Sequence, residues 1–327
     1  LHSERMTMRA RASTAAALVA VTTLALLNAA GNAQSRKKGH PKQGEVSRRA
    51  DAAMANTAAG AVSCQATGPL RPLAGLPEAS GLAVSRRVPG RFWTHNDSAT
   101  PTLTALDRTG RITGQLTLSG ARVDDWEAVE TGPCPAGSCV YVGDIGDNDE
   151  KRRTITVYRA PEPDAALGAP ARSEALTAVY PDGPHNAETL LVARDRLFIV
   201  TKERTPRIYA FPASPQPGQT MALTLVGASQ ASARPLATIT GGAVSNDGQW
   251  VVLRNHDTLA FYRADDLLQR RWRDARRTTV AMPGEPQGEG VAFGDEARVL
   301  FVAGEGKRQG GTFGRLECDL ARLAPAG

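Results

Sequence analysis

Five repeated segments with strand periodicity predict an all-β fold, a five-bladed β-propeller. Each segment begins with a polar residue and continues with small or apolar residues at alternating positions, which is the two-residue period of a β-strand. The leading polar residues are separated by 47, 61, 52 and 49 residues along the chain. Units of about forty to fifty residues made of short strands are typical of propeller blades. The leading residues are Ser80, Glu127, Glu188, Thr240 and Glu289.

Further strands follow the leading segment in each repeat. In the fourth repeat the connection is Asn246-Asp247-Gly248, and these residues tolerate the positive φ of a tight hairpin. Second strands are predicted at 91–94, 140–142, 197–200, 250–253 and 299–302. Third strands are predicted at 103–106, 154–158, 207–211 and 259–262. Helical periodicity is almost absent, which agrees with an all-β domain.

The last repeat is too short for a complete blade. It starts at Glu289 and leaves room for three strands at most. We therefore expect the segment after Cys64 to supply the outer strand, so that pairing of the N- and C-terminal strands closes the ring. The longer gap between Glu127 and Glu188 leaves a six-bladed propeller as the alternative.

The four cysteines predict two disulfides. Cys134 and Cys139 enclose Pro-Ala-Gly-Ser, a turn composition, so a bridge between them would clip one hairpin. Cys64 and Cys318 lie near the two ends of the repeat region, where a bridge would tie the open seam of the ring. Zinc would need short paired Cys or His spacings, and the sequence has none.

The first sixty residues differ from the repeats. Two arginines precede an apolar stretch at 15–30 and a small-residue exit, which predicts a secretory signal peptide over residues 1–33. Residues 34–60 are basic and lack periodic apolar positions, so we expect a flexible linker there and a single propeller domain over 61–327. We therefore expect a secreted or extracytoplasmic protein without a stable membrane span, with an uncleaved N-terminal anchor as the alternative.

The net positive charge of the chain comes from its first sixty residues. The formal net charge is +6, from 39 Lys and Arg against 33 Asp and Glu. Residues 1–60 hold nine of the basic residues and three of the acidic ones, which leaves 30 of each in the remainder. The repeat region is thus formally neutral, and this excludes a nucleic-acid partner on electrostatic grounds. Nothing in the sequence indicates oligomerisation, so we expect a monomer.

The leading residues of the repeats predict a metal site. The innermost strand of each blade lines the axis of a propeller, so these five residues should converge there. Three carboxylates in one ring would raise the pKa of one another unless a cation compensates. Calcium accepts carboxylate and hydroxyl oxygens in flexible geometry, so we expect Ca²⁺ as the cofactor. In the alternative, the hydroxyls bond to the backbone and the glutamates pair with Lys or Arg in a hydrated channel. The predicted ligands are Ser80, Glu127, Glu188, Thr240 and Glu289.

Polar residues at the ends of the second strands should surround the channel mouth. A mouth above a bound cation could hold a small polar or anionic ligand. If chemistry occurs there, the candidates for moving a proton are Asp144, His95 and His256. Turns are rich in Asp, Asn and Gly for backbone reasons alone, so the residues also have a purely structural interpretation. The predicted mouth residues are Asn96, Asp97, Asp144, Glu203, Arg254 and Glu305.

Two families resemble this pattern. The order Ser, Glu, Glu, Thr, Glu over five repeats resembles the calcium-activated nucleotidases, the five-bladed apyrases, with Thr240 where a serine is usual. This resemblance implies a central calcium held by hydroxyls and glutamates of the inner strands. The segments Glu78-Ala-Ser-Gly-Leu-Ala83 and Glu289-Gly-Val-Ala-Phe293 resemble the bacterial SdiA-regulated propellers.

Three functions agree with these observations. The first is a secreted, calcium-containing propeller that binds a small polar molecule or an envelope or extracellular partner at the channel mouth. The second is a calcium-dependent hydrolase of a phosphate ester, phosphoanhydride or lactone, with the same ring as its active site. The third is an interaction scaffold without metal. The fold alone does not choose among them, because propellers carry many functions.

Overall fold

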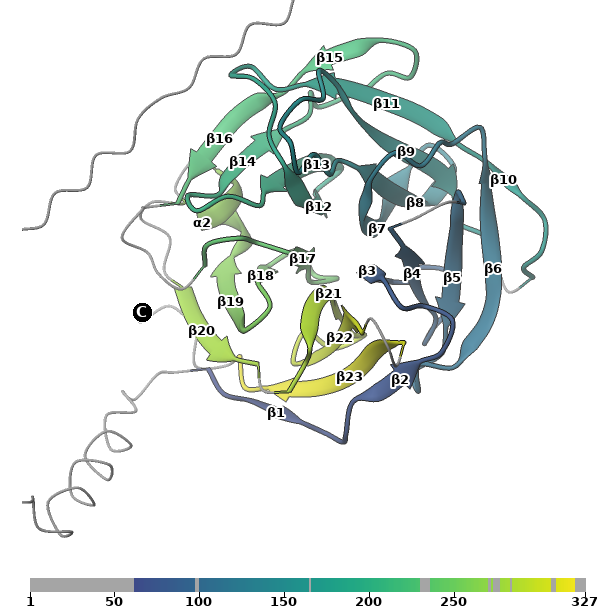
Figure 1. Ribbon diagram of the computed structural model, residues 1–327, viewed down its shortest axis with the longest axis vertical. Coiled ribbons are helices and arrows are strands. Elements are labelled where there is room, and N and C mark those ends of the chain that lie inside the picture. Colours follow the sequence, from purple (N-terminus) through teal and green to yellow (C-terminus); the bar gives the residue numbers. More distant parts are fainter. Residues whose placement is uncertain are drawn as a thin grey trace, which may run out of the picture. The chain divides into compact units, whose positions relative to one another are not determined.

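The computed structural model describes residues 62–97, 100–164, 166–229, 236–269, 272, 277–282, 284–306 and 310–320. These residues form five sheets arranged around a central axis as a five-bladed β-propeller (Figure 1). The five-bladed prediction is confirmed, and the longer second repeat is filled by additional strands of its own blade and of the blade before it. The predicted signal peptide and linker lie outside the described residues.

Each blade runs from an inner strand near the axis to an outer strand at the rim. The inner strands are β3 (Ala79–Val84), β7 (Trp126–Cys134), β12 (Ala187–Ala193), β17 (Gly241–Val244) and β21 (Gln287–Phe293). The second strands are β4 (Phe92–Asn96), β8 (Gly137–Asp144), β13 (Arg196–Thr201), β18 (Trp250–Arg254) and β22 (Val299–Glu305). The third strands are β5 (Thr102–Leu106), β9 (Ile155–Pro161), β14 (Arg207–Ala210), β19 (Thr258–Arg263) and β23 (Gly311–Cys318).

The outer strands connect neighbouring blades. Two short strands, β10 (Ala171–Arg172) and β15 (Thr220–Ala222), leave their own blade and pair in parallel with the outer strand of the preceding blade. The helix α2 (Ala264–Leu268) follows β19. Within the described residues, none of the helices has both the length and the apolar composition of a membrane span. The outer strands are β6 (Ile112–Ser119), β11 (Glu174–Val179), β16 (Thr224–Ala228), β20 (Arg277–Ala281), β1 (Cys64–Ala66) and β2 (Arg71–Leu73).

The N-terminal strands close the ring as predicted. Both β1 and β2 pair antiparallel with β23, and Figure 1 shows β1 beside β23 at the rim of the fifth blade. Cys64 lies directly opposite Cys318 and forms a disulfide with it, with 4.0 Å between the Cα atoms. The second disulfide, Cys134–Cys139, joins β7 to β8 next to their hairpin turn. Both predicted bridges are confirmed.

Apolar clusters fill the space between each pair of neighbouring blades. Trp93 and Trp126 belong to the cluster between the first and second blades, and both are fully buried. Phe261 and Phe293 belong to the cluster between the fourth and fifth blades. Because the inner strands β7 and β12 are buried along almost their whole length, packing of the kind found in close-packed protein interiors fixes their position near the axis. This packing holds the polar residues of the inner strands in place.

Candidate functional site

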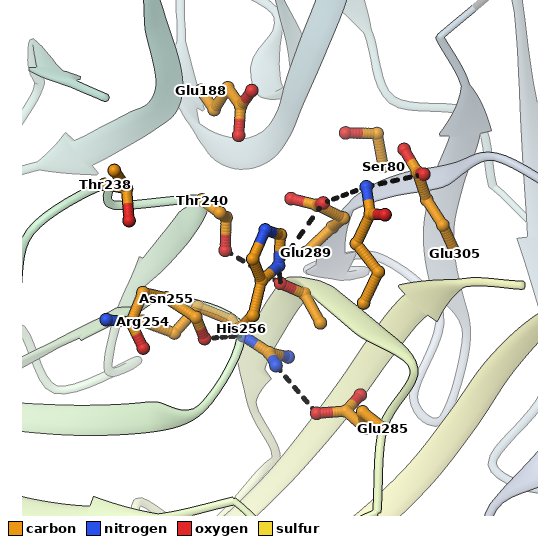
Figure 2. A network of polar contacts seen from close by, with 12 residues as sticks. Ser80, Glu188, Thr238, Thr240, Arg254, Asn255, His256, Glu285, Glu289 and Glu305 are labelled. Atoms are coloured by element: carbon orange, nitrogen blue, oxygen red, sulfur yellow. Dashed lines mark hydrogen bonds and ion pairs between the residues drawn. The ribbon is translucent and has the colours of Figure 1, made fainter. Parts of the chain in front are cut away.

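The five predicted ring residues lie near the axis, each on a different blade. Four of them belong to the inner strands β3, β7, β12 and β21, and Thr240 directly precedes β17. All five are buried, and Glu127 has the largest exposed fraction, 9%. Figure 2 shows Ser80, Glu188, Thr240 and Glu289 approaching a common region from different strands. The propeller therefore places the five aligned residues close to its axis.

The three ring glutamates sit at β-bulges. In β7, β12 and β21 the pairing register with the second strand shifts, and the residue left out is Glu127, Glu188 or Glu289 respectively. A bulge inserts one unpaired residue, bends the strand locally and changes the direction of a side chain. The same distortion in three blades thus places three carboxylates near the axis, where a regular strand would alternate side chains between the two faces of the blade.

The two ring hydroxyls bond to the next blade. The Ser80 hydroxyl donates to the backbone carbonyl of Glu127, 3.2 Å away, and lies 3.4 Å from its Oε2. The Thr240 hydroxyl donates to the carbonyl of Gly288 at 2.8 Å. In both cases the acceptor lies at the bulge of the following blade. The hydroxyls thus stabilise the bulges, and their oxygens retain lone pairs that a cation could use.

Burial dominates the electrostatics of the ring, and repulsion between carboxylates adds to it for Glu127 and Glu188. Burial, together with the charge of Glu188 and Glu289, raises the pKa of the Glu127 carboxyl far above its usual range. Burial and the neighbouring Glu289 raise the pKa of Glu188 in the same way, and burial raises the pKa of Glu289. Among the described residues, Glu188 Oε2 and Glu289 Oε2 are buried without a hydrogen-bond partner. Such a group is costly in a protein interior unless a cation or proton satisfies it.

Lys202 supplies one positive charge to this cluster. It directly follows β13, and its ammonium forms an ion pair with Glu188 Oε1. Burial lowers the pKa of Lys202, but Glu188, Glu289 and Glu127 together raise it above the ordinary value. The ammonium therefore interacts with all three ring glutamates. This contact is the lysine–glutamate pairing that the alternative interpretation of the ring describes.

A second acidic group lies beside Glu289. The Gln287 side-chain amide donates to Glu289 Oε1 at 3.0 Å and to Glu305 Oε2 at 2.7 Å. Burial, Glu289 and then Asp97 and Glu78 raise the pKa of Glu305 to about 7. Figure 2 shows Glu289 and Glu305 on the same side of the ring. The mouth is therefore acidic on the side of the fifth and first blades.

The predicted mouth residues occupy different environments. Glu203 lies 2.7 Å from His185 Nδ1, and Asn96 Oδ1 accepts a hydrogen bond from the backbone of Glu78 at 3.3 Å. Two others are buried and hold the backbone in place. Asp144 accepts from the Asp125 backbone N–H at 3.0 Å and pairs with Arg152, and Arg254 is fully buried against Glu285. Asp97 and Glu305 belong to the acidic side of the mouth.

The three candidates for moving a proton also differ in access. His95 is fully buried, and burial lowers its pKa to about 4, so its imidazole is neutral. Asp144 is buried and already bonded to Arg152. The side chain of His256 is 38% exposed, and its Nδ1 lies 3.7 Å from Glu289 Oε1 and 3.2 Å from the Gly288 carbonyl oxygen. Of the three candidates, His256 alone combines an exposed side chain with a position beside a ring glutamate.

The ring has the donor chemistry of a hard-cation site but not its spacing. Three carboxylates and two hydroxyls form an all-oxygen set, which suits Ca²⁺. The two unpaired carboxylate oxygens on Glu188 and Glu289 also fit a cation. Across the described part of the chain, however, no three His, Cys, Asp or Glu side chains already form a group close enough to hold a metal ion. The carboxylates would have to approach one another further on binding.

Sequence reasoning missed three residues of the site. None of them has the aligned repeat position: Lys202 directly follows β13, Asp125 directly precedes β7, and Gln287 is the first residue of β21. Burial raises the pKa of Asp125, which interacts with Glu127. The available signal for Lys202 was its place among the polar residues at the end of a second strand, where its positive charge suits it to pair with a ring glutamate.

Comparison with known proteins identifies no family for the chain. No protein-family model and no curated protein matches the chain. The fold and the site define the class, a disulfide-linked five-bladed β-propeller with a buried cluster of carboxylates near its axis. The resemblance to the apyrases and the SdiA-regulated propellers therefore rests on the short segments of the inner strands alone.

Proposed function

We propose that this chain is a secreted β-propeller that binds Ca²⁺ at its axial carboxylates and a small polar ligand or an extracellular partner at the channel mouth. The observation that carries the proposal is that Glu188 and Glu289, within a cluster of three carboxylates, each have a buried oxygen with no hydrogen-bond partner among the described residues. A divalent cation would satisfy both oxygens and relieve the repulsion among the glutamates.

The donor set favours calcium over other metals. Glu127, Glu188 and Glu289 would supply carboxylate oxygens, and Ser80 and Thr240 would supply hydroxyl lone pairs. A hard cation with flexible coordination suits such donors, whereas transition metals favour imidazole or thiolate ligands. Two disulfides fit an oxidising compartment outside the cytoplasm, where calcium is available at the concentrations that weak extracellular sites require.

The mouth would favour neutral or positively charged ligands while the metal is absent. Glu305, Asp97 and Glu78 lie near one another beside the ring and would repel an anion. Bound Ca²⁺ would reduce this negative potential and offer an electrophilic centre to an oxygen of the ligand. The metal would therefore change the class of ligand that the mouth accepts.

A calcium-dependent hydrolase is the second candidate function. His256 favours it, because its exposed imidazole lies beside Glu289 and is positioned to exchange a proton with a molecule in the mouth. The bound metal would supply charge stabilisation for a phosphoryl or carbonyl oxygen. Calcium-dependent turnover of a phosphate ester, phosphoanhydride or lactone that is lost in His256→Ala would support this function.

Isothermal titration calorimetry of the purified full chain with CaCl₂ tests the metal. We expect one site per chain with a Kd of roughly 0.1–1 mM, as in weak extracellular calcium sites. Saturating calcium should also raise Tm, because it binds only the folded state. The double variant Glu188→Gln/Glu289→Gln should abolish both effects. Glu174→Gln, which changes an exposed side chain paired with Arg159, is the matched control. Wild-type protein that gives neither heat nor a Tm shift would overturn the proposal.

A further inference from the structure

We infer that Lys202 is a tethered internal cation that competes with Ca²⁺ for the axial carboxylates, so that calcium binds only by displacing its ammonium. The inference rests on the proposed cation site and adds a residue that determines its affinity. Lys202 comes from the end of β13, not from the inner strands that carry the glutamates. Its ammonium pairs with Oε1 of Glu188. The other oxygen of that carboxylate, Oε2, has no hydrogen-bond partner among the described residues.

The contacts of Lys202 place its charge where a metal would have to bind. The ammonium forms an ion pair with Glu188, and the negative charges of Glu289 and Glu127 also act on it. These are the three carboxylates of the ring. A divalent cation that bound all three would meet the ammonium at short range in a poorly solvated region. Two like charges repel strongly there because little water screens them. The ammonium and the metal therefore exclude each other.

The unpaired oxygens show that one ammonium does not satisfy the ring. Glu188 and Glu289 are 4% and 3% exposed, yet each keeps one oxygen without a partner among the described residues. A single positive charge does not neutralise three carboxylates, and the remaining negative charge favours the binding of a further cation. Glu188 is paired with Lys202, and the three carboxylates do not form a preassembled metal group.

Lys202 can leave the ring without unfolding the propeller. Its side chain is 23% exposed, whereas that of Glu188 is 5% exposed, so the lysine has a route to solvent. A lysine ammonium on a flexible four-carbon stem can reach water while its backbone stays in place. Its backbone N–H donates to the Asn186 carbonyl at 2.9 Å, and this bond does not depend on the ammonium. Displacement thus requires only a change of side-chain conformer.

Two consequences follow for the whole protein. The internal ammonium would keep the ring partly neutralised when calcium is absent, so folding would not require the metal. The cost of displacing the ammonium would be subtracted from the intrinsic binding free energy of calcium, which lowers the apparent affinity. The site would then fill only where calcium is abundant.

Calcium titration of Lys202→Met tests the inference. Methionine removes the charge and keeps an unbranched side chain of similar length, so we expect Ca²⁺ to bind at least about tenfold more tightly than in the wild type. In chelator, Tm of the variant should fall below that of the wild type, and calcium should restore it. Lys202→Arg keeps the charge and should retain the weak affinity of the wild type. Lys151→Met removes an exposed lysine that pairs with Asp149 and is the control.

Each result distinguishes the inference from the proposed function. Tighter binding by Lys202→Met supports the inference, even if the wild type itself shows no measurable binding and the proposed function fails for it. Binding by the wild type that is unchanged or lost in Lys202→Met overturns the inference and leaves the calcium site standing. No binding by either protein overturns both.

Discussion

Arg254 and Glu285 form an ion pair in which neither side chain is exposed, with 2.7 Å between Nη2 and Oε2. Arg254 ends β18, and Glu285 lies in the connection to β21. The guanidinium also donates to the Gly290 carbonyl at 2.9 Å, so it ties the fourth blade to the fifth. Gly288 leaves room for it, because an added Cβ there would overlap the guanidinium. This contact lies beside the bulge that carries Glu289.

Removing the acidic partner of Arg254 should destabilise the propeller. Glu285→Ala leaves a guanidinium buried without its counter-charge, and breaking a buried pair in this way typically costs about 3–5 kcal/mol. Urea unfolding measures the change. Glu296→Ala is the control, because both side chains of its pair with Arg298 are 63% exposed, and an exposed pair contributes little to stability. Equal effects of the two substitutions would contradict the prediction.

The repeat pattern predicts the ring because propeller geometry converts a sequence position into a spatial one. Ser80, Glu127 and Glu289 share one position of an aligned segment, and blades related by rotation bring that position to the axis. The bulges at the glutamates were not predicted. A bulge depends on which residue the neighbouring strand leaves unpaired, and the alternation of a single strand does not contain that information.

Strand ends were harder to interpret than inner strands. Arg254 and Asp144 are polar residues at the ends of second strands, so the sequence favoured an exposed mouth for both. Each is instead buried in contact with an oppositely charged partner, Glu285 or Arg152. Pairing between distant segments decides whether a polar residue is exposed, and no local pattern records such pairing.

The two disulfides should differ in their contribution to stability. Cys64–Cys318 joins residues 254 apart, and Cys134–Cys139 joins residues 5 apart. In the loop-entropy description the longer bridge contributes roughly 5 kcal/mol and the shorter roughly 2 kcal/mol. Cys64→Ser/Cys318→Ser should therefore lower the free energy of unfolding more than Cys134→Ser/Cys139→Ser, measured by urea unfolding. The opposite order would contradict the loop-entropy description for these two bridges.

Gly146 should be needed for the position of Asp125 and of the ring glutamate Glu127. A Cβ added there would overlap the Asp125 carboxylate and lie 2.8 Å from Glu127 Oε1. Gly146→Ala should displace both carboxylates and weaken calcium binding several-fold in the titration proposed above. Gly68→Ala is the control, since its added Cβ meets no atom within 4 Å. Unchanged calcium affinity in Gly146→Ala would place Glu127 outside the metal site.

Glu130 should make the propeller less stable at alkaline pH. Burial raises the pKa of its carboxyl from 4.5 to about 8, with Arg86 acting in the opposite direction. Its Oε2 accepts from the Thr131 N–H at 3.2 Å, and its Oε1 is buried without a hydrogen-bond partner in the described structure. Because the folded state holds the proton more tightly than the unfolded state, the stabilisation is complete below pH 4.5 and is lost as the pH rises through about 8.

Glu130→Gln removes this titration and keeps a neutral side chain of the same size. A pKa difference of this size corresponds to a loss on the order of 5 kcal/mol in the wild type between the two ends of the range. The ring glutamates titrate in both proteins, so the informative quantity is the difference between their free energies of unfolding at each pH. We expect the variant to gain on the wild type steadily as the pH rises from 5 to about 8 and then to keep a constant advantage. Parallel stability curves would show that the Glu130 carboxylate is as well solvated in the folded chain as in the unfolded one.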